Sequence, residues 1–211
     1  MASRYFVGGN IATPQDWTAT IPVTNWSATS GGAGDASVPG AGDDAFLDAN
    51  SPVSTIDANI TVKSVDCTGY TNTLTHTAAV TLTIAGDLFK LVAGMTYTLG
   101  NAITSALSFT STTGTQGSPT AITSGGKTTG NVTLNGAGGY FTLQDAFLAG
   151  NTATLTHTAG TFDAGNQGVT TGLFSSSNAN TRVITMGSGT WTLTGGTGAT
   201  TVWDTATTTN L

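Results

Sequence analysis

The chain of 211 residues contains no glutamate and few charges of either sign. Charged residues make up 8% of the sequence, against roughly 25% in ordinary globular domains. The five Lys and Arg residues are scattered and the net charge is −6, whereas binding to phosphate backbones needs clustered basic side chains. We therefore expect no nucleic-acid partner.

Cysteine and long apolar runs are also scarce. The single Cys67 has no partner for an intrachain disulfide, and we expect a small buried side chain there. No segment approaches the apolar length of a membrane helix, and the N-terminus lacks the apolar core of a signal peptide. We expect a protein made in a cytosol that does not insert into membranes. Work outside the cell would require release by lysis or by a dedicated machine.

The abundant residues are glycine and threonine. The chain has 29 glycines, and roughly a fifth of it is threonine, well above ordinary usage. Threonine suits the pleated surface of a strand, and the residues that favour helices are rare here. The composition therefore predicts an all-β fold in which hydroxyl groups replace charges on the surface.

The segment "TLTHTA" occurs twice, starting at Thr73 and at Thr154. In both copies leucine and histidine share one parity and threonine takes the other, which is the alternation of a half-buried strand. We expect Leu74, His76, Leu155 and His157 to point inward as a repeated core. Further echoes of the apolar–Thr–Leu pattern are "VTLTIAG", "YTLG", "VTLNG", "FTLQD" and "WTLTG".

Units of this kind cannot bury an apolar face alone and are typical of a solenoid. We predict an all-β β-solenoid, a right-handed parallel β-helix of about seven coils over residues 43–211, each coil about 20 to 27 residues long. A β-sandwich is the alternative. We expect the end at Leu211 to continue into further chain or to be closed by a partner.

Residues 1–42 have a different character. Trp17, Trp26 and Pro39 stand in a background of Gly, Ser and Thr, and tryptophans in so polar a segment indicate that it folds over something apolar. We expect an irregular N-terminal region that caps the solenoid or attaches it to another protein.

No motif predicts a catalytic residue or a cofactor site. We expect His76 and His157 to be core residues whose nitrogens bond to nearby hydroxyls or carbonyls. Asp43, Asp44 and Asp48 form the densest acidic cluster and are weak calcium candidates, because Ca²⁺ takes carboxylate and carbonyl oxygens. The preferred interpretation of the cluster is a turn leading into the strand "DDAFLD".

The N-terminal pattern resembles a family of β-solenoid, tail-fibre-like virion proteins of tailed bacteriophages. The resemblance is most specific over residues 5–86 and compositional beyond them. It is carried by Val7–Gly9, Trp17, Asn25–Ser27, Gly31–Gly32, Pro39 and Asp43–Asp44, followed by Thr- and Gly-rich coils. A similar opening occurs in β-helical surface adhesins. The resemblance implies a solenoid and a place in the virion, and it supplies no catalytic residue.

These observations favour a non-enzymatic structural protein of a phage particle, made in the host cytoplasm. The expected partners are other virion proteins and further copies of the chain, with a trimer as one arrangement, and a host surface glycan. The alternatives are a carbohydrate-binding or polysaccharide-degrading β-helix and a bacterial surface adhesin.

Overall fold

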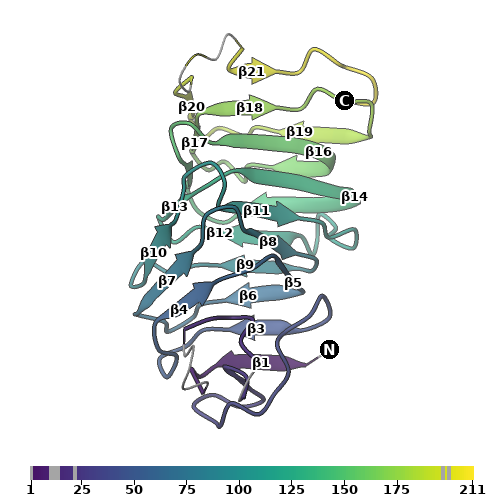
Figure 1. Cartoon of the computed structure of the whole chain (residues 1–211). Coiled ribbons are helices and arrows are strands. Elements are labelled where there is room, and N and C mark those ends of the chain that lie inside the picture. Colours follow the sequence, from purple (N-terminus) through teal and green to yellow (C-terminus); the bar gives the residue numbers. More distant parts are fainter. Residues whose placement is uncertain (1, 10–14, 21–22, 196–197, 199–200) are drawn as a thin grey trace.

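The computed structural model describes residues 2–9, 15–20, 23–195, 198 and 201–211. These residues form strands, turns and irregular segments, with no helix among them. The strands wind into a β-solenoid of about seven turns, which stands upright in Figure 1 with the N-terminus low and the C-terminus high. Consequently, no part of the described chain forms a helix that could cross a membrane.

Each coil contributes strands to three faces in a fixed order, which we call faces A, B and C. Face A contains β1 (Ser3–Phe6), β3 (Asp44–Phe46), β6 (Ser64–Asp66), β9 (Leu88–Lys90), β12 (Thr120–Thr123), the second halves of β14 (Val132–Leu143) and β16 (Thr154–Asp163), and β19 (Arg182–Thr185). Face C contains β5 (Ile60–Val62), β8 (Thr81–Ile84), β11 (Ala106–Phe109), the first halves of β14 and β16, β18 (Leu173–Ser175) and β21 (Trp203–Asp204).

Face B is divided into two sheets that do not pair with each other. The lower sheet holds β4 (Ser54–Ile56), β7 (Thr73–His76) and β10 (Thr96–Leu99), and the upper sheet holds β13 (Thr128–Thr129), β15 (Phe147–Ala149), β17 (Val169–Thr171) and β20 (Trp191–Leu193). All strand pairs are parallel except the pair of β1 with β2 (Trp26–Ser27). Parallel stacking confirms the predicted solenoid and rules out the β-sandwich; the right-handed winding stays a prediction.

The register of the parallel strand pairs stacks apolar residues on apolar residues and hydroxyl residues on hydroxyl residues, as the period-two pattern requires. One inward column of face C consists of Ile60, Leu82, Leu107, Val132, Leu155, Phe174 and Trp203. The neighbouring outward column, the hydroxyl ladder, consists of Thr61, Thr83, Ser108, Thr133, Thr156 and Ser175, and Asp204 follows it in the last rung. Apolar side chains thus form a continuous core, and hydroxyls cover its outside.

The two "TLTHTA" copies lie on different faces. The first forms β7 on face B, whereas the second begins β16 on face C. Both histidines point inward, His76 between Ile56 and Leu99, and His157 above Leu134. The repeat therefore marks a strand type and not a position in the coil.

Coil length varies more than the sequence predicts. On face A, the step from Asp44 to Ser64 is 20 residues, whereas the step from Phe89 to Ile122 is 33. The longer coil carries a loop between β11 and β12, closed by an antiparallel bridge between Thr115 and Ser118. The expected range of about 20 to 27 residues is therefore wrong for this coil.

At the N-terminal end of the solenoid, the chain's own first residues cover the edges of faces A and B. The antiparallel β2 pairs with the outer edge of β1, and Thr55 of β4 exchanges backbone hydrogen bonds with Gln15 and Trp17. Trp17 and Trp26 are fully buried and meet edge to face at 5.2 Å, and Trp26 Nε1 donates to the Trp17 carbonyl at 2.8 Å. Trp17 Nε1 itself is buried and has no hydrogen-bond partner among the described residues.

Glycines shape the corner between faces C and A. Strands β14 and β16 both continue around this corner, and the register of their pairing slips there. Four residues of β14 separate Asn135 from Tyr140, whereas in β16 only Gly160 separates the two residues with which they pair. Gly160 has φ +89°, and a Cβ atom there would lie 2.3 Å from the Gly136 carbonyl oxygen. Only glycine fits this close approach of successive coils.

We predict that Gly160→Ala lowers the free energy of unfolding by at least about 2 kcal/mol, because it adds a steric clash to an unfavourable φ. Gly138→Ala is the matched control: its φ is +75°, but nothing lies within 4 Å of the added Cβ. We expect that variant to cost only about 1 kcal/mol. Chemical unfolding measures both, and equal losses would contradict the proposed clash.

Candidate functional site

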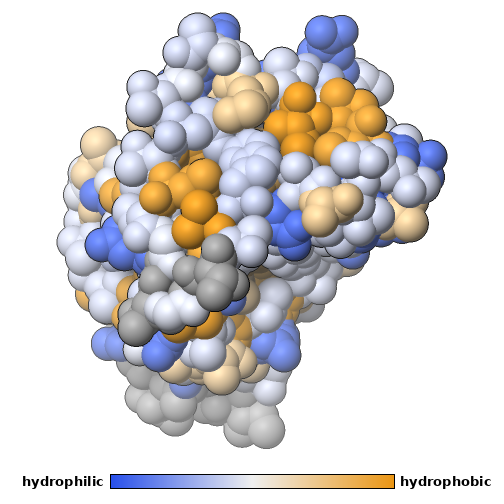
Figure 2. All heavy atoms as spheres, turned by 90° about the horizontal axis from the view of Figure 1, so that it is seen from above, coloured by the Kyte–Doolittle hydropathy of each residue, from blue (hydrophilic) through white to orange (hydrophobic). Residues whose placement is uncertain are grey.

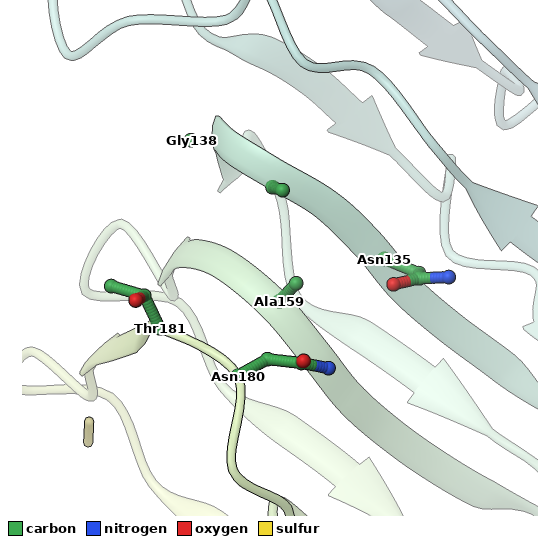
Figure 3. Close-up of a pocket in the computed structure, with 6 residues that line it drawn as sticks. Asn135, Gly138, Ala159, Asn180 and Thr181 are labelled. Atoms are coloured by element: carbon green, nitrogen blue, oxygen red, sulfur yellow. The ribbon is translucent and has the colours of Figure 1, made fainter. Parts of the chain in front are cut away.

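The Gly-rich corner leaves a groove on the surface. It has a volume of about 470 Å³ and is lined by Asn135, Ala137, Gly138, Ala159, Asn180 and Thr181. These residues come from the bulge of β14, from β16 and from the loop between β18 and β19, so the groove crosses three successive coils (Figure 3). Its polar groups are two side-chain amides and a hydroxyl, which suit hydrogen bonding to a neutral polar ligand.

His76 is fully buried and uses both ring nitrogens. Nε2 lies 3.1 Å from the Val80 carbonyl, so this nitrogen carries the hydrogen. Nδ1 lies 2.7 Å from the Tyr97 hydroxyl of the next coil and accepts its hydrogen. Burial lowers the pKa of His76 to about 4, although its bond to Val80 acts in the opposite direction. The ring is therefore neutral at pH 7.

His157 has the same arrangement on another face. Nε2 lies 3.0 Å from the Gly160 carbonyl, and Nδ1 lies 3.3 Å from Ser176 Oγ in the next coil. Burial lowers its pKa to about 4; the bond to Gly160 opposes that shift and the charge of Arg182 adds to it. The duplicated hexapeptide thus supplies, twice, a neutral histidine that links a carbonyl a few residues further along its own coil to a hydroxyl one coil higher.

Arg182 is buried at 1% exposure and lies beside this second histidine. Its Nε donates to Ser176 Oγ at 2.9 Å, so the serine is left to donate its own hydrogen to His157. The guanidinium also donates to the carbonyls of Asn178, Asn180 and Thr207. Oxygens of neutral groups satisfy this cation, and no ion pair to it occurs among the described residues. Arg182 therefore fastens the C-terminal segment to the last coils.

The three acidic calcium candidates do not share a site. Asp43 accepts backbone hydrogens from Ala2 and Gly40, and Asp48 accepts one from Asn50. Asp44 binds Lys63 at 3.0 Å. No cluster of three or more metal-ligating His, Cys or Asp side chains occurs in the described part of the chain.

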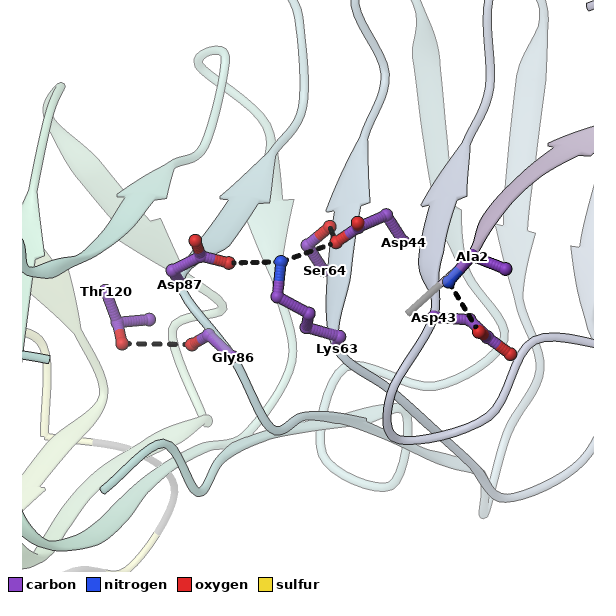
Figure 4. A network of polar contacts seen from close by, with 8 residues as sticks. All are labelled: Ala2, Asp43, Asp44, Lys63, Ser64, Gly86, Asp87 and Thr120. Carbon is purple, nitrogen blue, oxygen red and sulfur yellow. Dashed lines mark hydrogen bonds and ion pairs between the residues drawn. The ribbon is translucent and has the colours of Figure 1, made fainter. Parts of the chain in front are cut away.

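Lys63 bridges successive coils (Figure 4). Its Nζ lies 3.0 Å from Asp44 and 3.2 Å from Asp87, carboxylates that belong to the coils below and above. Burial alone would lower the pKa of Lys63, but hydrogen bonds to the two carboxylates outweigh it and the pKa is raised. The acidic residues here are thus structural partners of a lysine.

The residues expected to cap or attach the solenoid, Trp17, Trp26 and Pro39, are all buried. Pro39 is buried close to the start of face A, and Trp17 and Trp26 are enclosed, so none of the three presents a large exposed side chain for a partner. The exposed apolar side chains lie mainly elsewhere: Val183, Met186 and Leu211 gather at the C-terminal end around a second groove of about 330 Å³.

The chain was compared with family models, curated proteins and solved structures. No family model, no curated protein and no solved structure matches it.

Two features of the structure were not predicted from the sequence. The corner groove arises from a register slip, and its signal is the glycine-rich "NGAGGY" inside an otherwise alternating strand. No sequence pattern indicated the role of Arg182, because an arginine at the start of a short alternating run is normally predicted to face solvent.

We predict that acid weakens the fold between pH 6.5 and pH 4. The folded-state pKa of each histidine is about 4 and the unfolded value is 6.5, so in this window only the unfolded chain takes up the proton. Stability is full above pH 6.5, and each histidine removes up to about 3 kcal/mol by pH 4. Urea unfolding across this range measures the loss.

The variant His157→Gln serves as the control for this prediction. Glutamine keeps a donor and an acceptor without titrating, so the loss between pH 6.5 and pH 4 should shrink by about half. A loss unchanged in His157→Gln, or a wild-type stability that is flat across the window, contradicts the assignment.

Proposed function

We propose that this protein is a non-enzymatic structural component of a bacteriophage particle: a fibre, spike or decoration subunit. The resemblance over residues 5–86 and the solenoid fold support this assignment. The stacked backbone ladder makes a stiff rod, because the strands of each coil are hydrogen-bonded to strands of the neighbouring coils. The proposed partners are other virion proteins and further copies of the chain, a trimer being one arrangement of those copies.

The observation that carries the proposal is the hydroxyl ladder on face C. The outward residues of this face carry no charge from β5 to β18, and the ladder is continuous through six rungs. An isolated soluble protein normally places charges on such a surface. An uncharged column of threonine and serine side chains suits lateral packing against another rod, because charged side chains in such a contact would have to be desolvated.

The test uses purified particles from lysates of the source strain and a charged double variant. Peptides of this chain should co-purify with the particles. The variant Thr133→Lys with Thr156→Lys puts two cations on adjacent rungs, about 4.8 Å apart, and should no longer be incorporated. Mass spectrometry of the particle fraction measures both results.

The matched control is Thr75→Lys with Thr98→Lys, which makes the same change on adjacent rungs of face B. We expect this control to be incorporated normally. The proposal fails if the chain is absent from particles, or if both double variants are incorporated like the wild type.

A second candidate function is carbohydrate binding, favoured by the corner groove. The groove offers amide and hydroxyl groups to a neutral polyol, and no carboxylate lines it, which favours binding over cleavage.

We predict that Asn135→Ala weakens binding to a host-surface polysaccharide by about tenfold, the loss expected for one hydrogen bond of about 1.4 kcal/mol. Isothermal titration measures it, with Asn101→Ala, an exposed asparagine outside the groove, as the control. Equal affinities in wild type and Asn135→Ala would exclude the groove.

A further inference from the structure

Asn180 gives the corner groove a fixed hydrogen-bond acceptor. Its Nδ2 donates to the Thr158 carbonyl at 3.1 Å, and its backbone N–H donates to Asn178 Oδ1 at 2.9 Å. A carbonyl oxygen can only accept, so the nitrogen of the Asn180 amide must face Thr158. The Asn180 Oδ1 atom accepts no hydrogen bond from the described residues and is left for a donor on a ligand.

The turn that carries Asn180 is held from inside the coil by Arg182. The guanidinium donates to the carbonyls of Asn178 and Asn180, and to Asn178 Oδ1 at 3.0 Å. Because the Arg182 side chain is buried, water competes little for these bonds. The acceptor is therefore in place before a ligand arrives, which reduces the entropy lost on binding.

Asn135 lines the same groove from the bulge of β14. Its side chain is exposed and makes no hydrogen bond to the described residues, so the amide can turn to offer a donor or an acceptor. In Figure 3 the side chains of Asn135 and Asn180 extend to the same side of the corner. One ligand can therefore donate to Asn180 and accept from Asn135.

The rest of the lining contains small residues. Ala137, Gly138 and Ala159 carry nothing larger than a methyl group, and even a Cβ atom added at Gly138 would meet nothing within 4 Å. The volume of about 470 Å³ falls in the range of about 300 to 1,000 Å³ that ligand pockets span. The groove thus has room for a substituent larger than a hydroxyl, and the two alanine methyls favour one that ends in an apolar group.

The groove is unsuited to a ligand that carries a positive charge. No Asp lines it, and Arg182, the residue after Thr181, is a buried cation without an ion-pair partner among the described residues. A ligand ammonium would be repelled by this guanidinium and would find no carboxylate to compensate it. Free amino sugars, which are protonated at pH 7, are therefore disfavoured.

We propose that the corner groove binds an N-acetylated amino sugar through its acetamido group. The acetamido N–H donates to Asn180 Oδ1, and the acetamido carbonyl accepts from the Asn135 amide. The acetyl methyl group lies against Ala137 and Ala159. A sugar hydroxyl cannot supply a donor, an acceptor and a methyl group together. This inference rests on the second candidate function, carbohydrate binding, and adds the class of sugar to it.

The test compares the methyl β-glycosides of N-acetylglucosamine and of glucose, which differ only in the substituent on one carbon of the ring. Titration of the full chain up to about 10 mM sugar, followed by NMR, measures both affinities. We expect the N-acetylated glycoside to bind at least about tenfold more tightly, the factor expected for one additional hydrogen bond. Saturation transferred from the protein should be greatest at its acetyl methyl protons.

The variant Ala137→Leu fills the space assigned to the acetyl methyl group. Ala137 is exposed, so the larger side chain does not disturb the core. We expect the variant to bind the N-acetylated glycoside no more tightly than the glucoside. The matched control is Ala146→Leu, at an exposed alanine outside the groove, which should bind like the wild type. Circular dichroism checks that both variants fold.

Three outcomes would overturn the proposal: equal affinities for the two glycosides, no binding of the N-acetylated one, or equal affinities in Ala137→Leu and Ala146→Leu. The polysaccharide titration with Asn135→Ala reports separately on the candidate function. A groove that binds polysaccharide through Asn135 but does not distinguish the two glycosides keeps carbohydrate binding and loses the acetamido assignment.

Discussion

The parallel backbone ladder is the constraint on which the structure depends. Once each strand must stack in register on the strand one coil below, every residue acquires a fixed neighbour above and below it. The column from Ile60 to Trp203 and the hydroxyl ladder beside it follow from that single requirement. The ladder also explains the scarcity of charge, because a charged column would place like charges about 4.8 Å apart along the rod. Where charges do stack, at Asp44, Lys63 and Asp87, their signs alternate.

Stacking also determines how polar groups enter the core. A turn that bends the chain inward presents a carbonyl to the interior, and that carbonyl needs a donor. Neutral histidine supplies the donor and an acceptor on one rigid ring, so it can bond to a carbonyl of its own coil and to a hydroxyl of the next. This is the arrangement of His76 with Val80 and Tyr97. Arg182 satisfies several carbonyls at once, because its guanidinium has five hydrogens to donate.

The sequence predicts the parts of this fold that repeat and misses those that depend on register. Alternation identified β7 and β16 as strands of a solenoid, because a period of two is visible in a single segment. It could not assign them to faces B and C, since alternation is the same on every face. The 33-residue step at Phe89 was missed because a loop insertion leaves no periodic signal. The corner groove depends on how four residues of β14 stack against one of β16, which a single strand's sequence does not reveal.

The first and last described coils differ in how they continue the parallel ladder. At the N-terminal end an antiparallel strand stops the ladder, since β2 cannot propagate parallel stacking beyond β1, and buried tryptophans close the core. In the last described coil the Asn210 carbonyl accepts the backbone N–H of Arg182. One coil lower, the Thr181 carbonyl accepts the backbone N–H of Gly160 in the same way, so the chain near Asn210 follows the geometry of an ordinary rung. An end that keeps this geometry presents the same hydrogen-bonding pattern that holds the interior coils together. The parallel ladder of face A therefore stops at β1, whereas the last described rung keeps the geometry by which one coil stacks on the next.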